Sequence, residues 1–159
     1  MEPKKQHIVC IPAAAQGHIN PMFKLAKLLH SRGFYITFVH SEFNYIRLSN
    51  STTIQNLDDF KFETIPDGLP PENKRGVLDV PELCRSLSGP GPRNAVKTLL
   101  MKLGKSYDVP PITCVISDVH MIFTYEVGEE LGIQVMVLYM KRRSESFDLG
   151  KDRYFIHSM

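Results

Sequence analysis

The stretch HIVCIPAAAQGHINPMFKLAKLLHSRG, residues 7–33, decides the fold of this chain. Its apolar, β-branched beginning at residues 8–11 is short and is bounded by a proline, which predicts a buried strand. Farther along, apolar side chains recur at helical spacing. Asn20 is a favourable N-cap, Pro21 suits the first helical position, and Gly33 predicts the helix end. We therefore expect a strand, a loop and an amphipathic helix in succession.

His18 is expected in that loop, just before the helix, together with Gln16 and Gly17. The partial positive charge of a helix N-terminus disfavours a second positive charge, so the imidazole is expected to stay neutral. A neutral histidine near pH 7 is what a general base requires. The alternative is that His18 only packs or forms a hydrogen bond in the loop, and this stretch alone leaves both interpretations open.

Composition narrows the class of protein. The chain has 159 residues, of which 43% are hydrophobic and 23% charged, and its formal net charge is +2. These values predict one globular domain and argue against a nucleic-acid partner. The three cysteines, Cys10, Cys84 and Cys114, are far apart, which favours reduced thiols over a disulfide framework or a metal site. With no signal-peptide pattern and no apolar run long enough to cross a membrane, a cytoplasmic location is expected.

Further strands and helices are predicted to alternate along the chain. Apolar or alternating runs predict strands at 34–40, 60–65, 112–118 and 133–139, and helical spacing predicts helices at 93–103 and 124–131. Short helices at 44–48 and 80–87 are expected as well, with Ser88–Pro92 breaking the second. This alternation predicts an α/β fold, a Rossmann-like parallel sheet with helices on both faces.

Asp118 is expected to face the same crevice as His18. In a sheet of order 3-2-1-4-5, ligands bind beyond the carboxyl ends of strands one and four, and Asp118 ends strand four. A carboxylate on one imidazole nitrogen fixes the tautomer and stabilises the imidazolium that forms when the other nitrogen takes a proton. The alternative for Asp118 is a turn or helix-cap residue. For His120 two positions are open, lining the crevice or pointing to solvent at the rim, and the second is favoured. No dinucleotide or P-loop motif is present.

Three segments carry a resemblance to a known family. They are AAAQGHINPMFKLAKLLHSRGFYITFVHSEFNYIRL (13–48), FKFETIPDGLPP (60–71) and PPITCVISDVHMIFTYEVGEELGI (110–133). Together they resemble the N-terminal domain of plant family 1 UDP-dependent glycosyltransferases, most closely the subgroup that glucosylates small terpenoid, cyanohydrin or cytokinin-type acceptors. The resemblance covers about residues 6–139.

The resemblance implies a GT-B fold, in which two Rossmann-like domains face each other, and this chain corresponds to the acceptor-binding half. It implies that His18 is the base that deprotonates an acceptor hydroxyl and that Asp118 supports His18. The acceptor oxygen then attacks the anomeric carbon of a UDP-sugar, usually UDP-glucose, with inversion and loss of UDP, and neither a metal nor a cofactor is needed. By position, Ala13, Gln16, Gly17 and His120 are expected on the acceptor side.

The chain departs from the family after Tyr139. Residues 140–159, MKRRSESFDLGKDRYFIHSM, form a charged tail without a domain-like pattern. The C-terminal donor-binding domain is expected to be absent, and the chain is therefore expected to bind UDP-sugar poorly and to transfer little or no sugar by itself. The alternatives are a non-catalytic module that binds small molecules and a non-functional truncated product.

Overall fold

The described part of the chain is an α/β sandwich. The computed structural model describes residues 4–42, 44–45, 57–66, 86, 89–141 and 153–158. Strands β1 (His7–Ile11), β2 (Tyr35–Ser41), β3 (Phe60–Ile65), β4 (Ile112–Asp118), β5 (Gln134–Lys141) and β6 (Arg153–Ser158) form one sheet of order β3-β2-β1-β4-β5-β6. Strands β1 to β5 pair in parallel, in the predicted order.

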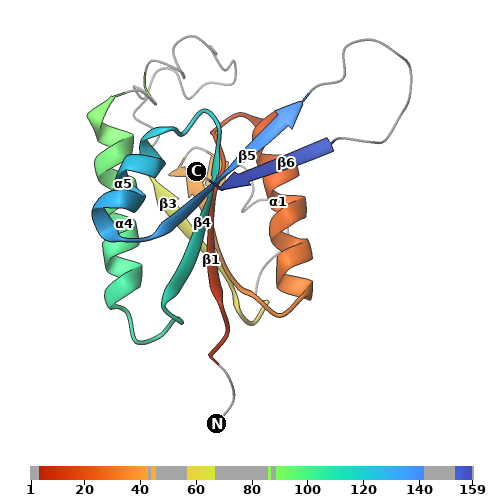
Figure 1. The fold of residues 1–159 in the computed structure, drawn as a ribbon, viewed down its shortest axis with the longest axis vertical. Helices are drawn as coiled ribbons and strands as arrows, with labels where there is room; N and C mark the ends of the chain where they lie inside the picture. The colour runs from red at the N-terminus through yellow and green to blue at the C-terminus, as the bar shows by residue number, and fades with distance from the viewer. Residues whose placement is uncertain are drawn as a thin grey trace.

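Helices cover both faces of this sheet. Helix α1 (Gln16–Ser31) lies on one side, and α4 (Pro90–Lys105) and α5 (Phe123–Leu131) lie together on the other (Figure 1). A Rossmann-like arrangement was predicted, and the sheet order and the helix placement confirm it. None of the described helices is long and apolar enough to cross a bilayer.

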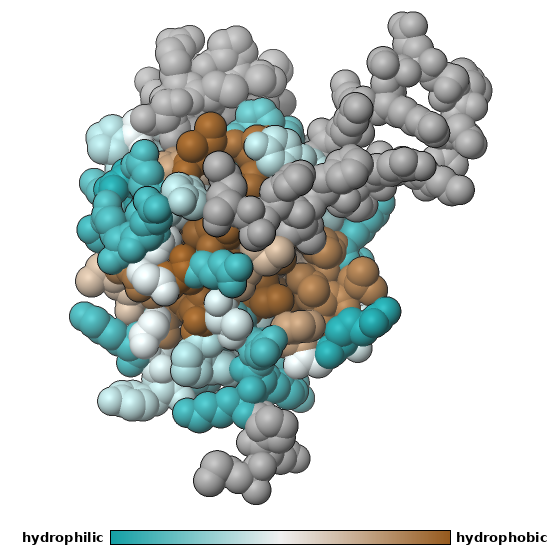
Figure 2. All heavy atoms as spheres, viewed as in Figure 1, coloured by the Kyte–Doolittle hydropathy of each residue, from teal (hydrophilic) through white to brown (hydrophobic). Residues whose placement is uncertain are grey.

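Each face of the sheet packs a core of its own. Ile19, Met22 and Ala26 of α1 are buried against Ile36 and Phe38 of β2. On the opposite face, the buried residues include Val9, Ile11, Val39, Val115, Val96, Leu99, Leu100 and Val127. Because successive strand residues point to opposite faces, continuous apolar strands fill both cores at once. In the space-filling view, apolar residues gather across the middle of the face and toward the end opposite the N-terminus (Figure 2).

The start of α1 differs from the prediction. The helix begins at Gln16, with Ala15 as N-cap, so Pro21 lies inside the helix and His18 belongs to its first turn. The Ala15 carbonyl accepts the backbone N–H groups of His18 and Ile19, at 2.9 and 3.0 Å. The prediction that Asn20 caps the helix was wrong because the apolar face extends back to Ile19, which is buried in the core.

Two further elements differ from the prediction. Helix α4 begins at Pro90 instead of after a break at 88–92. A proline is tolerated in the first turn of a helix, because the N–H that it lacks would have had no helical partner there. The tail was expected to lack any domain-like pattern, yet residues 153–158 pair antiparallel with β5. Their sequence, RYFIHS, has high strand propensity. The short helices expected at 44–48 and 80–87 lie mostly outside the described residues.

Candidate active site

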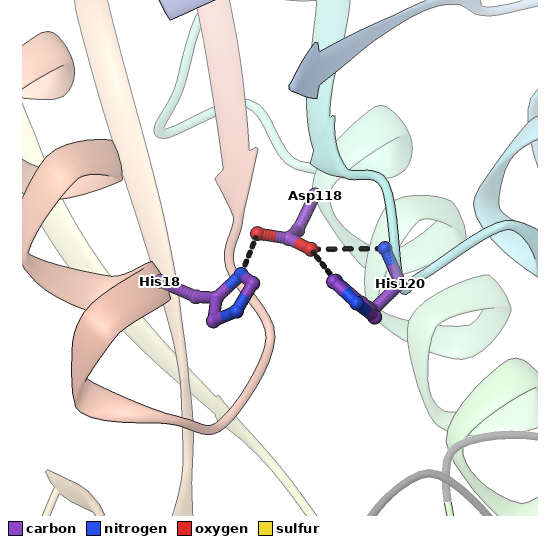
Figure 3. A group of neighbouring side chains, drawn as sticks. All are labelled: His18, Asp118 and His120. Atoms are coloured by element: carbon purple, nitrogen blue, oxygen red, sulfur yellow. Dashed lines mark hydrogen bonds and ion pairs between the residues drawn. The ribbon is translucent and has the colours of Figure 1, made fainter. Parts of the chain in front are cut away.

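The parallel register brings Asp118 and the first turn of α1 together. Ile11, the last residue of β1, pairs with Ser117 of β4, so Asp118 lies just beyond the end of β1. The chain then crosses the strand ends in a short loop and enters α1, whose third residue is His18. Residues 100 positions apart in sequence thus face each other at the carboxyl edge of the sheet (Figure 3).

One carboxylate holds two histidines. The Nδ1 atom of His18 lies 2.8 Å from Oδ2 of Asp118. The other oxygen, Oδ1, accepts the backbone N–H and the ring Nδ1 of His120, each at 2.9 Å. The Asp118 side chain is fully buried, whereas that of His18 is 27% exposed and that of His120 is 50% exposed. The buried Asp118 carboxylate therefore bridges two imidazole rings that solvent can reach.

These contacts shift the pKa values of the pair in opposite directions. Burial by itself raises the pKa of Asp118, but the hydrogen bonds from His18 and His120 outweigh burial and hold the pKa below its usual value. The hydrogen bond that His18 donates to Asp118 raises the pKa of His18 against the opposing effect of burial. We expected the helix N-terminus to dominate and keep His18 neutral, and the adjacent carboxylate is instead the larger influence.

The hydrogen bonds also fix the tautomer of His18. An ionised carboxylate only accepts hydrogen bonds, so the Nδ1 atom of His18 must carry the proton in this contact. In the neutral ring, Nε2 is then left with a free lone pair, which can accept a proton from a ligand. The arrangement has the chemical ability of a general base whose conjugate acid is stabilised by a buried anion.

His120 makes contacts with Asp118 that the sequence interpretation did not predict. It was expected at the rim, and half of its side chain is exposed. Its ring nevertheless lies edge-on to the ring of His18, with centroids 4.7 Å apart, and contacts Asp118 twice. In an Asx turn, the aspartate side chain accepts the backbone N–H of the residue two positions later in the chain. The Asp-x-His spacing was therefore the sequence signal that could have revealed the contact between Asp118 and His120.

The other residues predicted on the acceptor side differ in how far they are exposed to solvent. Ala13 is buried and lines a cavity at the strand ends. Gly17 is exposed, and the space where a Cβ would project is open. The Gln16 side chain is not among those described. Sequence analysis missed Asn44, whose side-chain amide donates to the Ala14 carbonyl at 2.6 Å and so ties the loop after β1 to the end of β2.

The same three side chains have the composition of a metal site. Among the described residues, His18, Asp118 and His120 form one group whose ligand atoms lie within 4.8 Å of one another. Both rings already use Nδ1 to contact the carboxylate. A cation bound through these Nδ1 atoms would have to replace their ring protons, so the hydrogen bonds drawn in Figure 3 favour proton transfer over metal binding at Nδ1.

Comparisons with known proteins agree with this architecture. No family model matches the chain. The chain is 48% identical over 136 residues to UDP-glycosyltransferase 85A5 of Arabidopsis thaliana, covering 82% of this chain and 28% of the relative. It is 49% identical over 141 residues to 7-deoxyloganetin glucosyltransferase of Catharanthus roseus, covering 86% and 29%. The chain thus spans less than a third of the length of these relatives.

Solved structures give the same result for the fold. Os79 from O. sativa in complex with UDP matches with a TM-score of 0.60 at 25% identity, covering 80% of this chain and 27% of that one. Arabidopsis thaliana UGT89C1 in complex with quercetin matches with a TM-score of 0.64 at 19% identity, covering 83% and 34%. The chain belongs to the plant UDP-glycosyltransferases, transferases of the GT-B fold, and its described residues form part of the N-terminal domain of that fold.

Proposed function

We propose that this chain is the acceptor-binding part of a UDP-sugar-dependent O-glycosyltransferase that transfers glucose, with inversion, to a hydroxyl of a small plant metabolite. The observation that carries the proposal is the 2.8 Å contact between His18 Nδ1 and the buried Asp118 carboxylate. Relatives named 7-deoxyloganetin glucosyltransferase support a glucosyl donor and a small acceptor. UDP-glucose is the proposed donor, and we assign its binding to no residue of this chain.

The proposed step begins at Nε2 of His18. An acceptor hydroxyl donates its hydrogen bond to Nε2, and its proton moves to that nitrogen as the oxygen attacks the anomeric carbon of the donor. The bond between that carbon and the diphosphate oxygen breaks, and UDP leaves with the electron pair. Asp118 stabilises the imidazolium that forms on His18, because its anionic Oδ2 already accepts the Nδ1 proton.

The acceptor is proposed to lie beside the first turn of α1. Ala13, Gln16, Gly17 and His120 are the residues that we assign to its binding, within an acceptor domain at 6–139. The buried free thiols of Cys10 and Cys114 suit a reducing compartment, which supports a cytoplasmic location for the protein.

A chimera tests the catalytic assignment. Residues 6–139 replace the matching segment of the Catharanthus roseus 7-deoxyloganetin glucosyltransferase, and glucose transfer from UDP-glucose to 7-deoxyloganetin is measured. His18→Ala is expected to lower kcat by about 10²- to 10⁴-fold, the usual contribution of a general base. His30→Ala, on the same helix but in contact with the Asp58 carbonyl, is the matched control and is expected to change kcat less than about twofold.

The outcome separates the two classes of function. If the His18→Ala chimera folds, by its circular dichroism spectrum and unfolding transition, and keeps the parent rate, His18 is not the base. If the parent chimera binds 7-deoxyloganetin but transfers nothing, this segment is a small-molecule binding module without chemistry.

A further inference from the structure

A small cavity lies beside the His18–Asp118–His120 cluster, where β1, β2 and β3 end. Its apolar lining includes Ile19 and Met121, which directly follow His18 and His120 in the chain. Its polar lining consists of His40, Ser41 and Asn44. The volume of the cavity, about 20 Å³, admits one group the size of a water molecule.

His40 is held rigidly in the wall of this cavity. Its ring stacks on Phe62 with the centroids 5.4 Å apart and contacts Phe38 at 4.8 Å. Only 4% of the residue is exposed. Burial lowers the pKa of His40 to about 4, so the ring is neutral at physiological pH. It therefore presents fixed, uncharged ring nitrogens.

One of these nitrogens has no partner. Within the described part of the chain, Nδ1 of His40 is buried and forms no hydrogen bond. A buried polar atom left without a hydrogen bond costs about 1–3 kcal/mol. The neighbouring Asn44 makes other hydrogen bonds: its side-chain amide donates to the Ala14 carbonyl and its backbone N–H donates to Ser41 Oγ. His40 Nδ1 is thus a buried polar atom of a cavity-lining residue that is left without a hydrogen bond.

We propose that the cavity is a subsite for a second hydroxyl group of the acceptor, bound by Nδ1 of His40. This inference rests on the proposed function and names a feature of its substrate, a hydroxyl other than the one that reacts at His18. A hydroxyl both donates and accepts, so it satisfies either tautomer of a neutral imidazole. No lining residue carries a charge at neutral pH, so a charged substituent would be buried without a counter-charge and is disfavoured.

Two probes of the same skeleton test the subsite. Benzyl alcohol and 4-hydroxybenzyl alcohol differ by one hydroxyl, and both are titrated into the chain while NMR follows the His40 ring nitrogens and the amide signals. The diol is expected to bind about three- to tenfold more tightly, the range of one net hydrogen bond, and to shift the His40 nitrogen signals. His40→Phe, with His40→Leu in case the phenyl ring overfills the site, is expected to abolish the preference. His30→Gln, outside the cavity lining, is expected to retain it.

Each outcome decides a different point. Equal affinities with unchanged His40 signals would mean that only a trapped water occupies the cavity, and would overturn the subsite while leaving the proposed function intact. A preference that survives in both His40 variants would also overturn it. Failure of both alcohols to bind would overturn the subsite together with acceptor binding by this chain.

Discussion

Replacing Asp118 by asparagine tests the central contact directly. The carboxylate accepts three hydrogen bonds, one from His18 and two from His120. An asparagine can keep its carbonyl oxygen on the His120 side, and its NH₂ group then faces His18 in place of Oδ2. The proton on His18 must therefore move from Nδ1 to Nε2, and the nitrogen assigned as the base loses its free lone pair.

The expected size of the effect follows from these contacts. A hydrogen bond to a charged group contributes about 1.5–3 kcal/mol, and the neutral amide avoids the cost of burying a charge, which offsets part of the loss. We expect Asp118→Asn to lower the free energy of unfolding by about 2 kcal/mol at pH 5.5. The same change is expected to lower the pKa of His18, since the hydrogen bond that raises it is gone.

The pH dependence gives a second measurement with a defined sign. The raised pKa of His18 stabilises the fold fully below its ordinary value of 6.5, and this contribution is lost as pH rises through the folded-state pKa. The lowered pKa of Asp118 stabilises the fold above its ordinary value of 3.8, and this contribution is lost as pH falls through the folded-state pKa. The difference between parent and variant is therefore expected to be largest between pH 3.8 and 6.5.

Urea unfolding at several pH values and NMR titration of the histidine rings provide the readout. His120→Gln is the comparison variant, because it removes the ring contact to Oδ1 but leaves the His18 contact in place. An unchanged pKa of His18 in Asp118→Asn would refute the reasoning, since it would mean that the contact between the two side chains does not form in solution.

Three further predictions concern the framework around the site. Gly128→Ala places a Cβ against the Val135 side chain and is expected to cost about 1–3 kcal/mol in urea unfolding. Its control, Gly104→Ala in α4, meets nothing within 4 Å and is expected to gain about 0.5–1 kcal/mol. Leu100→Ala, at a residue 1% exposed, is expected to cost about 2–5 kcal/mol, again by urea unfolding. Acidification from pH 6.5 to about 4 is expected to cost on the order of 3 kcal/mol through His40, because the unfolded chain protonates it first. In His40→Phe, a stability-versus-pH curve is expected to lose that contribution, and an unchanged curve would contradict it.

The sequence predicted the sheet well because most of its strands are continuous apolar runs and the strand at 60–65 alternates apolar and polar residues. The strands at 60–65 and 112–118 were predicted with the observed bounds, and the order 3-2-1-4-5 on which the site prediction was conditional is the one observed for β1 to β5. The start of α1 was missed because two local effects compete there. A side-chain N-cap such as Asn20 contributes about 1 kcal/mol, whereas full burial of a side chain such as Ile19 contributes about 1.5–3 kcal/mol. Tertiary packing therefore set the helix start.

The site was only partly predictable for a related reason. The proximity of His18 and Asp118 follows from topology, since His18 follows β1, Asp118 ends β4, and these strands are neighbours at the switch point of the sheet. The contact of His120 with Asp118 depends on a local turn, in which the backbone N–H and the ring of His120 both donate to Oδ1 of Asp118. The orphan nitrogen of His40 depends on the packing of two phenylalanines around its ring, and no periodicity in the sequence encodes that packing.

The register that aligns the site is set at the opposite end of β4. His7 pairs with Ile112 but Ile8 pairs with Cys114, so β4 has one extra residue, Thr113, at its start. The Thr113 hydroxyl accepts the backbone N–H of His7 at 3.2 Å, which stabilises this irregularity. A one-residue change of register turns every side chain to the other face of a sheet, so the position of Asp118 against α1 depends on this irregularity. The carboxylate that contacts His18 is thus aligned by a register shift at the far end of its own strand.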